Sequence, residues 1–416
     1  MHSDPFKEKA IRWADQFEHC CVLDSNGYTD LNGRFNYLVA AGSKHILYAG
    51  EDAFKELKNF QETYRTWMFG YLGYDLKNQL ETLISANKDS LFFPDMFFFI
   101  PEYVIAVSAK GIEVLLGSAD ILGEIASFPL RKVQLQQAAF TVDPAVCKDD
   151  YINNVKAIKE HINRGDIYEL TYCQEFFAEN ASIDPLQTYM QLNALSPTPF
   201  AGYLKLKNKY ILCASPERFL CKTGTRLISQ PIKGTARRGK TVEEDLQSKL
   251  RLTSDLKEQT ENVMIVDLVR NDLTKSAIPG SVSVTELFGI YTFPQVHQMI
   301  STVACELAPE VHFIDAIKNA FPMGSMTGAP KIRAMQLIET YERSKRGVYS
   351  GAMGYISPDG DFDLNVIIRS ILYEAERQYL SFQVGGAITY ASDPEKEYQE
   401  CLLKASAILE TIKGPL

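Results

Sequence analysis

The feature that most constrains the fold is a series of strand-forming stretches separated by very short turns. These stretches are rich in β-branched and aromatic side chains and lie at residues 348–356, 363–373 and 379–389. Pro358-Asp359-Gly360 forms one of the turns. Because parallel strands need a crossover of a dozen or more residues, these strands must pair antiparallel. Long stretches with helical periodicity alternate with such strands, at 242–274, 330–344 and 393–413. The pattern predicts an α+β fold rather than a repeated βαβ unit.

The N-terminal third has a different pattern. From residue 12 to about residue 140 the chain shows short strand candidates and turns, such as 37–41 and 97–108. A helical period follows at 149–164, and the next strand candidate is 167–177. A chain of 416 residues has room for two or three domains. We expect a β-rich N-terminal subdomain, 1–145, that is integrated with a larger region, 146–416.

The overall charge excludes one class of function. The 43 Lys and Arg residues are outnumbered by 52 Asp and Glu residues, which gives a net charge of −9. Nucleic-acid binding needs a basic surface, so we expect no nucleic acid as partner. The most apolar stretch, 91–107, is interrupted by prolines and acidic residues, and the N-terminus lacks the apolar segment of a signal peptide. We therefore expect a cytoplasmic protein that does not cross a membrane.

Two helical stretches each carry a pair of glutamates three residues apart. Glu258 and Glu261 follow Ser254, a candidate N-cap, and Glu397 and Glu400 follow an Asp-Pro helix start. The spacing places both carboxylates of a pair on one helix face. If the two faces converge, four carboxylates would form the oxygen-rich site that Mg²⁺ prefers. Spacing alone favours the alternative, in which the glutamates lie on a solvated face.

Two glycine-containing segments suit an anion. Gly324 and Gly328 precede a helix opened by Pro330, with Lys331 close by, and free backbone amides at such a terminus attract negative charge. The spacing differs from that of a nucleotide-binding P-loop. The second segment, Gly385-Gly386, is expected to end a strand, although such a pair is more often a simple turn.

A lysine and a glutamate form the third candidate. Lys233 lies in a segment punctuated by proline and glycine, 16 residues after Glu217. A lysine in an apolar or cationic environment can act as a nucleophile, and a nearby glutamate can act as its acid and base. The alternative is an ordinary loop cation with a glutamate paired to a neighbouring arginine.

Six ordered segments resemble those of the chorismate-utilising enzymes, a family that includes the anthranilate, aminodeoxychorismate, isochorismate and salicylate synthases. The segments are SPERF (215–219), PIKGTARRG (231–239), ENVMIVDLVRNDL (261–273), GAPKIRAM (328–335), GAMGYISPDGDFDLNVIIRS (351–370) and GGAITYASDPEKEYQE (385–400). The resemblance implies layered antiparallel sheets flanked by helices, the chorismate-binding fold of anthranilate synthase component I. It also implies chorismate as substrate.

The resemblance assigns roles to the candidate residues. It implies that Mg²⁺ is held by Glu261 and Glu400, with Glu258 and Glu397 in support. Residues implied to bind the substrate carboxylates or to lie near its ring are His297, Ser325, Gly328, Lys331, Tyr355, Arg369, Gly385 and Gly386.

Within this family, Lys233 favours amination at C4. Aminodeoxychorismate synthases are similar in carrying PIKGT, whereas anthranilate synthases have alanine at the lysine. The resemblance implies that Lys233 attacks C2 of chorismate while Glu217 protonates the departing 4-hydroxyl, and that ammonia then adds at C4. A separate glutamine amidotransferase is the expected ammonia donor. The alternatives are an anthranilate synthase component I and a non-catalytic chorismate-binding subunit. Glu169 departs from the family pattern, since isochorismate and salicylate synthases carry lysine and many aminating members glutamine there.

Overall fold

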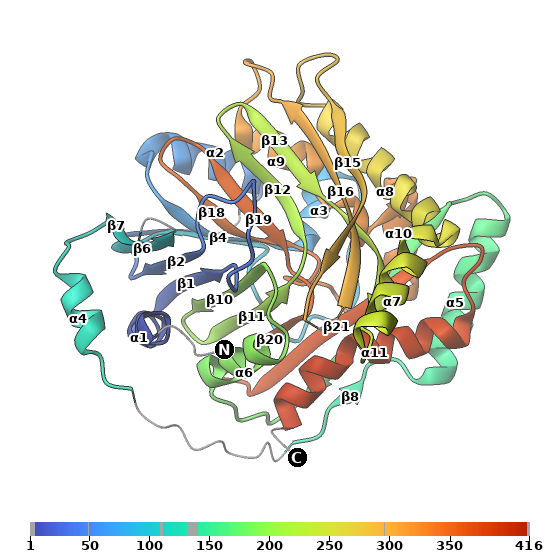
Figure 1. Ribbon diagram of the computed structural model, residues 1–416, viewed down its shortest axis with the longest axis horizontal. Helices are drawn as coiled ribbons and strands as arrows, with labels where there is room; N and C mark the ends of the chain where they lie inside the picture. Colours follow the sequence, from blue (N-terminus) through green and yellow to red (C-terminus); the bar gives the residue numbers. More distant parts are fainter. Residues whose placement is uncertain (1–4, 49, 109–110, 131–139, 295, 414–416) are drawn as a thin grey trace.

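The computed structural model describes residues 5–48, 50–108, 111–130, 140–294 and 296–413. Two antiparallel sheets dominate it (Figure 1). The first sheet has the order β17 (Gly328–Ala329), β9 (Glu169–Ala178), β21 (Tyr379–Ile388), β20 (Ser370–Glu374), β11 (Lys209–Ser215), β10 (Phe200–Leu206), β1 (His19–Asp24), β2 (Tyr37–Ala41), β6 (Tyr103–Ser108) and β7 (Gly111–Leu116), and β8 (Asp143–Pro144) pairs with β9.

The second sheet is built in the same way. Its order is β14 (Ile232–Arg237), β16 (Val296–Glu306), β13 (Arg226–Gln230), β12 (Arg218–Thr223), β19 (Phe362–Val366), β18 (Ala352–Ile356), β4 (Met68–Leu72), β5 (Met96–Ile100) and β3 (His45–Tyr48), and β15 (Ser283–Thr292) pairs with β16. The antiparallel pairing that the short turns required is present, for example between β18 and β19. The predicted α+β class is confirmed.

Helices flank both sheets. Those that share a core with the first sheet are α1 (Pro5–Ala14), α4 (Ile121–Ser127), α5 (Lys148–Asn163), α6 (Pro185–Leu195), α10 (Lys331–Tyr341) and α11 (Pro394–Lys413). Those that share a core with the second sheet are α2 (Ala53–Tyr64), α8 (Leu256–Thr274) and α9 (Phe313–Ala320), and α7 (Val242–Ser254) packs beside β14. The short helices η1 (Tyr74–Leu76), α3 (Lys77–Leu80) and η2 (Gly324–Met326) complete the described elements.

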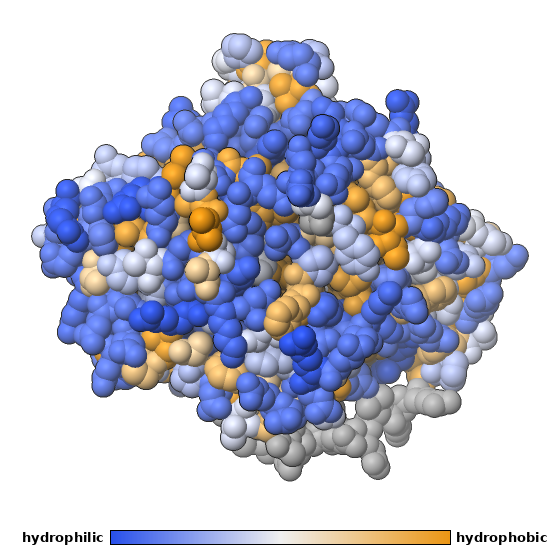
Figure 2. Space-filling model, turned by 180° about the vertical axis from the view of Figure 1, so that it is seen from behind, coloured by the Kyte–Doolittle hydropathy of each residue, from blue (hydrophilic) through white to orange (hydrophobic). Residues whose placement is uncertain are grey.

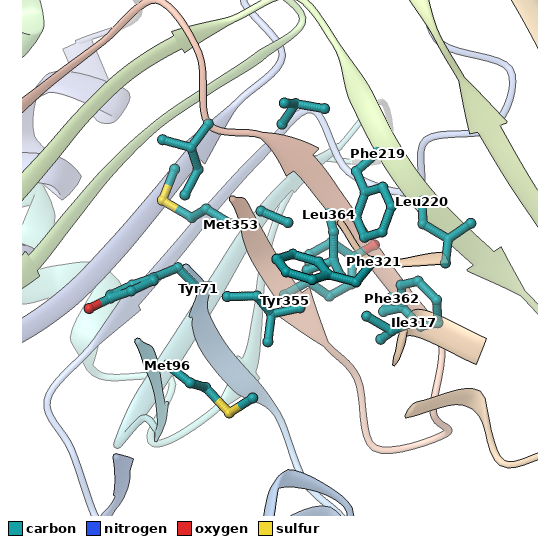
Figure 3. Close-up of a cluster of buried hydrophobic side chains, with 14 of the residues drawn as sticks. Tyr71, Met96, Phe219, Leu220, Ile317, Phe321, Met353, Tyr355, Phe362 and Leu364 are labelled. Atoms are coloured by element: carbon teal, nitrogen blue, oxygen red, sulfur yellow. The ribbon is translucent and has the colours of Figure 1, made fainter. Parts of the chain in front are cut away.

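Strand alternation explains the two cores. Successive side chains of a strand point to opposite faces, so Cys21 joins the core between the sheets while Cys20 and Val22 join the core under the helices. Figure 3 shows part of the core between the sheets, where Phe219, Leu364 and Phe321 pack together. The outer face seen in Figure 2 is mostly hydrophilic, with small separate apolar areas. Within the described ranges, no helix is both long and apolar enough to cross a membrane.

The N-terminal strands extend both sheets. β1 pairs with β10 and β4 pairs with β18, so hydrogen bonds cross the expected boundary near residue 145. The boundary itself stays a prediction.

Three segments differ from the expectation. The strand candidate 363–373 is two strands, β19 and β20, that lie in different sheets, and 97–108 is likewise divided between β5 and β6. The helix candidate 242–274 is also two helices, because Asp255 has an extended backbone and its side chain accepts hydrogen bonds from the amides of Lys257 and Glu258. Asp255, rather than Ser254, is therefore the N-cap of the helix that carries Glu258 and Glu261.

The N-terminal third also contains helices where only strands and turns were expected. α2 is the clearest case, with Asp52 as its N-cap and buried Phe54, Leu57 and Gln61 at helical spacing. Only two of these three buried positions are apolar, which leaves a weak hydrophobic period in the sequence.

Candidate active site

Two neighbouring connections carry the chain from one sheet to the other. Glu217 lies between β11 and β12, and Arg369 lies between β19 and β20. The connections are joined by hydrogen bonds from the Val366 amide to the Glu217 carbonyl, 3.0 Å, and from the Ala214 amide to the Arg369 carbonyl, 3.2 Å. Arg369 has a φ of 50°, a left-handed conformation that allows the sharp change of sheet. The crossing therefore brings a carboxylate and a guanidinium together that are far apart in the sequence.

Burial makes Glu217 a candidate acid. Desolvation raises the pKa of Glu217 to about 7, although the Ser325 hydroxyl, Lys233 and Arg369 oppose the rise. Burial also lowers the pKa of Arg369, and Glu217 opposes that shift. A carboxyl group that titrates near neutral pH can donate a proton in one step and accept one in the next.

Lys233 reaches the same region from β14. One extra residue of β14 lies between the pairs Ile232–Ile300 and Thr235–Gln298, so Lys233 and Gly234 form a bulge. Gly234 has a φ of 96°, and an added Cβ would lie 3.1 Å from Glu258 Oε2. The glycine thus permits both the bulge and a close approach to α8.

A second carboxylate faces Lys233. Glu169 begins β9, and its Oε2 lies 3.9 Å from Lys233 Nζ, with side chains that are 1% and 11% exposed. Neither carboxylate oxygen of Glu169 has a hydrogen-bond partner among the described residues. Burial raises the pKa of Glu169, and Lys233 opposes the rise.

The two glutamate-bearing helices converge on this region, α8 from above and α11 from below on the right of Figure 1. Burial and the nearby Glu261 raise the pKa of Glu258 to about 7, and Glu400 on α11 contributes. Burial raises the pKa of Glu397, and the Ser392 hydroxyl opposes this. The helices thus bring the four carboxylates into electrostatic contact.

Two lysines partly neutralise the carboxylates. Lys404 Nζ lies 2.8 Å from Glu400 Oε1, and it lowers the pKa of Glu400. Lys257 Nζ lies 3.7 Å from Glu261 Oε1. Burial lowers the pKa of Lys257, but the surrounding carboxylates outweigh it and hold the pKa above its ordinary value. Each lysine is four residues from its partner, a spacing that is visible in the sequence.

The four glutamates of α8 and α11 have the chemistry to bind a divalent cation. Glu261 Oε1 is buried without a hydrogen-bond partner in the described part of the chain, and the raised pKa of Glu258 reflects both burial and crowding by negative charge. A divalent cation would bind the unsatisfied Glu261 oxygen and would offset the negative charge around Glu258. Carboxylate oxygens are the ligands that such cations prefer. Within the described ranges, however, no three His, Cys, Asp or Glu side chains are gathered closely enough to hold a metal as they stand. Binding would therefore require the glutamates to move together.

A buried ion pair holds the segment with Ser325 and Gly328. Arg346 donates to the Met326 carbonyl, 2.6 Å, and to the Thr171 carbonyl, 2.9 Å, and it pairs with Glu342 at 2.7 Å. The Ser325 hydroxyl has no hydrogen bond of ordinary geometry within the described residues. Gly328 lies against β9, where an added Cβ would overlap the Glu169 carbonyl. No sequence signal pointed to Arg346.

The Gly385-Gly386 pair lies inside a strand and not at the end of one. Gly385 and Gly386 of β21 pair with Cys173 and Tyr172 of β9. An added Cβ at Gly385 would overlap the Tyr172 carbonyl, and one at Gly386 would lie 3.3 Å from Glu397 Oε2. The glycines therefore allow close packing of β21 against β9 and α11, whereas we had expected the pair to end a strand and to leave its amides free.

Lys331, a predicted substrate-binding residue, lies away from the region around Glu217 and Lys233. Lys331 forms an ion pair with Asp272 and donates to the Pro322 carbonyl at 2.9 Å. Asp272 is 11 residues beyond Glu261, roughly 16 Å along α8 at 1.5 Å per residue. The ammonium group of Lys331 is thus paired with Asp272 near the C-terminal end of α8. A role of Lys331 in substrate binding stays a prediction.

His297 and Tyr355 are engaged elsewhere. His297 Nε2 lies 3.0 Å from Asp245 Oδ1 on α7, and Nδ1 lies 3.0 Å from Thr292 Oγ1. Tyr355 packs on Phe35 and lines a separate cavity that also contains Arg218, Asp30 and Asp363. The structure therefore does not gather these two side chains with Glu217 and Lys233, and their expected contacts with substrate stay predictions.

Comparisons with known proteins agree with the resemblance seen in the sequence. The sequence profile described as chorismate binding enzyme matches residues 19–410. Aminodeoxychorismate synthase component 1 of Escherichia coli (strain K12) is 34% identical over 349 residues, which cover 83% of this chain and 76% of that protein. A probable chloroplastic aminodeoxychorismate synthase of Oryza sativa subsp. japonica is 35% identical over 388 residues, and the chain spans only 43% of its length.

Solved structures show the same fold. Anthranilate synthase component I from Streptococcus pneumoniae TIGR4 superposes with a TM-score of 0.80 at 27% identity, covering 92% of this chain and 94% of that one. The menaquinone-specific isochorismate synthase MenF from Escherichia coli has a TM-score of 0.78 at 17% identity, covering 97% and 91%. The predicted anthranilate synthase component I-like fold is confirmed.

Proposed function

The chain belongs to the chorismate-binding enzyme family, and from that premise we propose that it aminates chorismate at C4 to give 4-amino-4-deoxychorismate. The observation that carries the proposal is Lys233, a lysine beside the buried carboxyl groups of Glu169 and Glu217. The similarity to aminodeoxychorismate synthases supports it. The product would serve the synthesis of 4-aminobenzoate and folate.

The proposed chemistry divides one substitution into two. Lys233 Nζ forms a bond to C2 while the C4–O bond breaks and the ring double bonds shift, and Glu217 donates its proton to the departing hydroxyl. Ammonia then forms a bond to C4, the double bonds shift back, and the bond between C2 and Lys233 breaks. Covalent attack makes C4 the position of amination because the second step reverses the first. A Glu217 pKa of about 7 lets this side chain donate the proton near neutral pH.

We propose that Mg²⁺ assists binding. Glu261 and Glu400 would hold the ion, with Glu258 and Glu397 in support, and the ion would supply positive charge for a substrate carboxylate. Arg369 would hold the other carboxylate, since it is the buried cation next to Glu217. In an acidic protein these cations must reverse the field locally for a dianion to bind.

The magnesium proposal has its own test. Glu400→Gln should raise the Mg²⁺ concentration required for half-maximal activity by at least about tenfold, and calorimetry should detect weaker Mg²⁺ binding without substrate. Glu395→Gln, on the exposed side of the same helix, is the matched control. Unaltered Mg²⁺ titrations of Glu400→Gln would remove this residue from the ligand set.

We also propose that the ammonia comes from a separate glutamine amidotransferase. None of the eight cysteines lies in the G-x-C-x-G setting of an amidotransferase nucleophile. Glutamine should therefore support amination only when such a subunit is added, whereas ammonium salts should suffice without it. Glutamine-dependent turnover by the purified chain alone would contradict this.

A direct assay tests the proposed reaction. The protein is incubated with chorismate, ammonium and Mg²⁺, and the products are separated by chromatography and identified by mass. We expect 4-amino-4-deoxychorismate with no release of pyruvate. Fluorescent anthranilate together with pyruvate would instead identify an anthranilate synthase.

That alternative has one observation in its favour, the TM-score of 0.80 to a component I of anthranilate synthase. The fold therefore supports both functions, and Lys233 is the residue that favours amination at C4. A chain that binds chorismate but forms neither product would be the non-catalytic subunit.

A further inference from the structure

Glu169 is a buried carboxylate with one charged neighbour of opposite sign. Its side chain is 1% exposed, both of its oxygens lack hydrogen bonds among the described residues, and Lys233 Nζ lies 3.9 Å from Oε2. A carboxylate in such a place costs several kcal/mol of desolvation unless it is paired and hydrogen-bonded. A structural role would normally satisfy both oxygens, so the missing bonds require another explanation.

The surroundings hold this carboxylate in place. The Glu169 backbone is paired with Ala329 of β17, and Arg346 binds the Thr171 carbonyl two residues further along β9. The charged groups that face Glu169 are Lys233 from β14 and Glu261 from α8, and the latter is negative. Lys233 in turn faces Glu217 and Glu400 in addition to Glu169. Among the described residues, Lys233 is thus the proton donor placed to interact with Glu169.

We propose that Glu169 accepts the proton that Lys233 must lose before its amine can attack chorismate. This inference rests on the proposed function, because it assigns a role to Glu169 in activating the same lysine. A lysine that remains an ammonium ion has no free electron pair and cannot form a bond to C2.

The step is a simple proton transfer. One N–H bond of the Lys233 ammonium breaks, one O–H bond forms on Glu169, and a charged pair becomes a neutral amine and a neutral acid. Burial favours the neutral pair, which agrees with the raised pKa of Glu169. When ammonia expels the lysine, Glu169 can return the proton to the departing amine. The 3.9 Å separation must shorten to hydrogen-bond distance, as is common when substrate closes a site.

This proposal gives the two carboxyl groups beside Lys233 different roles. Glu217 must begin protonated because it donates to the leaving hydroxyl, and Glu169 must begin ionised because it accepts from the ammonium.

The test measures formation of the covalent adduct at Lys233 as a function of pH. Wild type, Glu169→Gln and Glu169→Asp are mixed with chorismate and Mg²⁺ without ammonia, quenched at intervals and weighed by mass spectrometry. Glu179→Gln, an exposed glutamate just beyond the same strand, is the matched control. Thermal unfolding of each variant checks that it is folded.

We expect Glu169→Gln to form the adduct about 10²-fold more slowly than wild type at pH 7. The difference should shrink as pH rises, because solvent then removes the lysine proton. Glu169→Asp retains a carboxylate, so it should keep the shape of the wild-type pH profile at a lower rate, and this comparison remains informative if the glutamine variant does not fold.

Two outcomes would overturn the role of Glu169. One is a loss in Glu169→Gln of about threefold or less at pH 7. The other is a loss that is the same at every pH, which would indicate positioning. Failure of the proposed function is distinguishable, because wild type would then form no adduct at any pH.

Discussion

Two buried pairs of opposite charge illustrate different uses of a charge inside this protein. Arg346 and Glu342 are 1% and 4% exposed, lie 2.7 Å apart, and bind backbone groups as well: Arg346 the carbonyls of Met326 and Thr171, and Glu342 the Cys173 amide at 2.9 Å. Lys233 and Glu169 lie 3.9 Å apart, and within the described residues both oxygens of Glu169 lack hydrogen bonds. The first pair is satisfied by the protein, whereas the second keeps two acceptor oxygens that no described residue satisfies.

The difference has an energetic basis. Desolvation of an ion pair is repaid only when hydrogen bonds satisfy the remaining donors and acceptors. The Arg346–Glu342 pair meets this condition and joins β9 to the segment carrying Ser325. The Lys233–Glu169 pair does not, and such incompletely satisfied groups are typical of active sites. The two pairs therefore predict opposite consequences of mutation.

The largest effect is expected from removing the lysine. Lys233→Ala should lower kcat for amination by at least about 10³-fold, because the nucleophile is lost. Thermal unfolding should change less than in a variant that lacks Arg346, because the unpaired Glu169 can take up a proton and is then buried as a neutral acid. Lys240→Ala, an exposed lysine just after β14, should retain activity. Product formation by chromatography measures the effect, and unchanged turnover in Lys233→Ala would refute the nucleophile.

Mutation of the Arg346–Glu342 pair should mainly lower stability, in contrast to mutation of Lys233, which should mainly lower activity. Arg346→Met leaves the Glu342 carboxylate buried and unpaired, so we expect a loss of about 3–5 kcal/mol in the free energy of unfolding by denaturant. The double variant Arg346→Met with Glu342→Leu removes both charges and should recover part of this loss. If the single variant is as stable as wild type, the Arg346–Glu342 pair does not stabilise the fold as its contacts suggest.

The pH dependence should sharpen the comparison further. Glu217 must be protonated to act as an acid, so kcat should fall about tenfold per pH unit above its pKa of about 7. Because burial raises this pKa, the folded protein binds more protons than the unfolded chain between the ordinary value of 4.5 and about 7. The contribution of Glu217 to stability is therefore lost as pH rises through that window.

Glu217→Gln provides the check on both effects. It should abolish the basic limb of the kcat profile, leaving a low and flat rate, and should flatten the fall in unfolding free energy between pH 5 and pH 7. A variant that keeps the wild-type limb would show that another group titrates there.

The smallest effect concerns the helix that carries Glu258 and Glu261. Asp255→Ala removes the side-chain acceptor for the Lys257 and Glu258 amides and should cost about 1 kcal/mol of unfolding free energy. Ser254→Ala is the matched control and should cost less, since among the described residues the Ser254 hydroxyl bonds only to carbonyls of the preceding turn. Equal losses in the two variants would contradict the assignment of Asp255 as the cap.

Much of the fold was predictable because its signals are local. Short turns require antiparallel strands, and helical periods appeared at 149–164 and 393–413, close to the observed α5 and α11. The helices of the N-terminal third were missed because their apolar positions are sparse. The division of 363–373 was missed because this segment contains no glycine or proline to mark the point where the chain changes sheet.

The candidate site likewise has features that local sequence signals predict and features that depend on the tertiary structure. The sequence by itself determined the class of fold, the glutamate pairs on single helix faces, and the presence of Lys233 and Glu217, because these depend on spacing within a few turns or on short ordered motifs. Only the tertiary structure decided that Lys233 meets Glu169, that Lys331 is bound by Asp272, and that both ring nitrogens of His297 are engaged. Such contacts join distant positions through strand register and burial, and the free energy that selects them comes from the packed core.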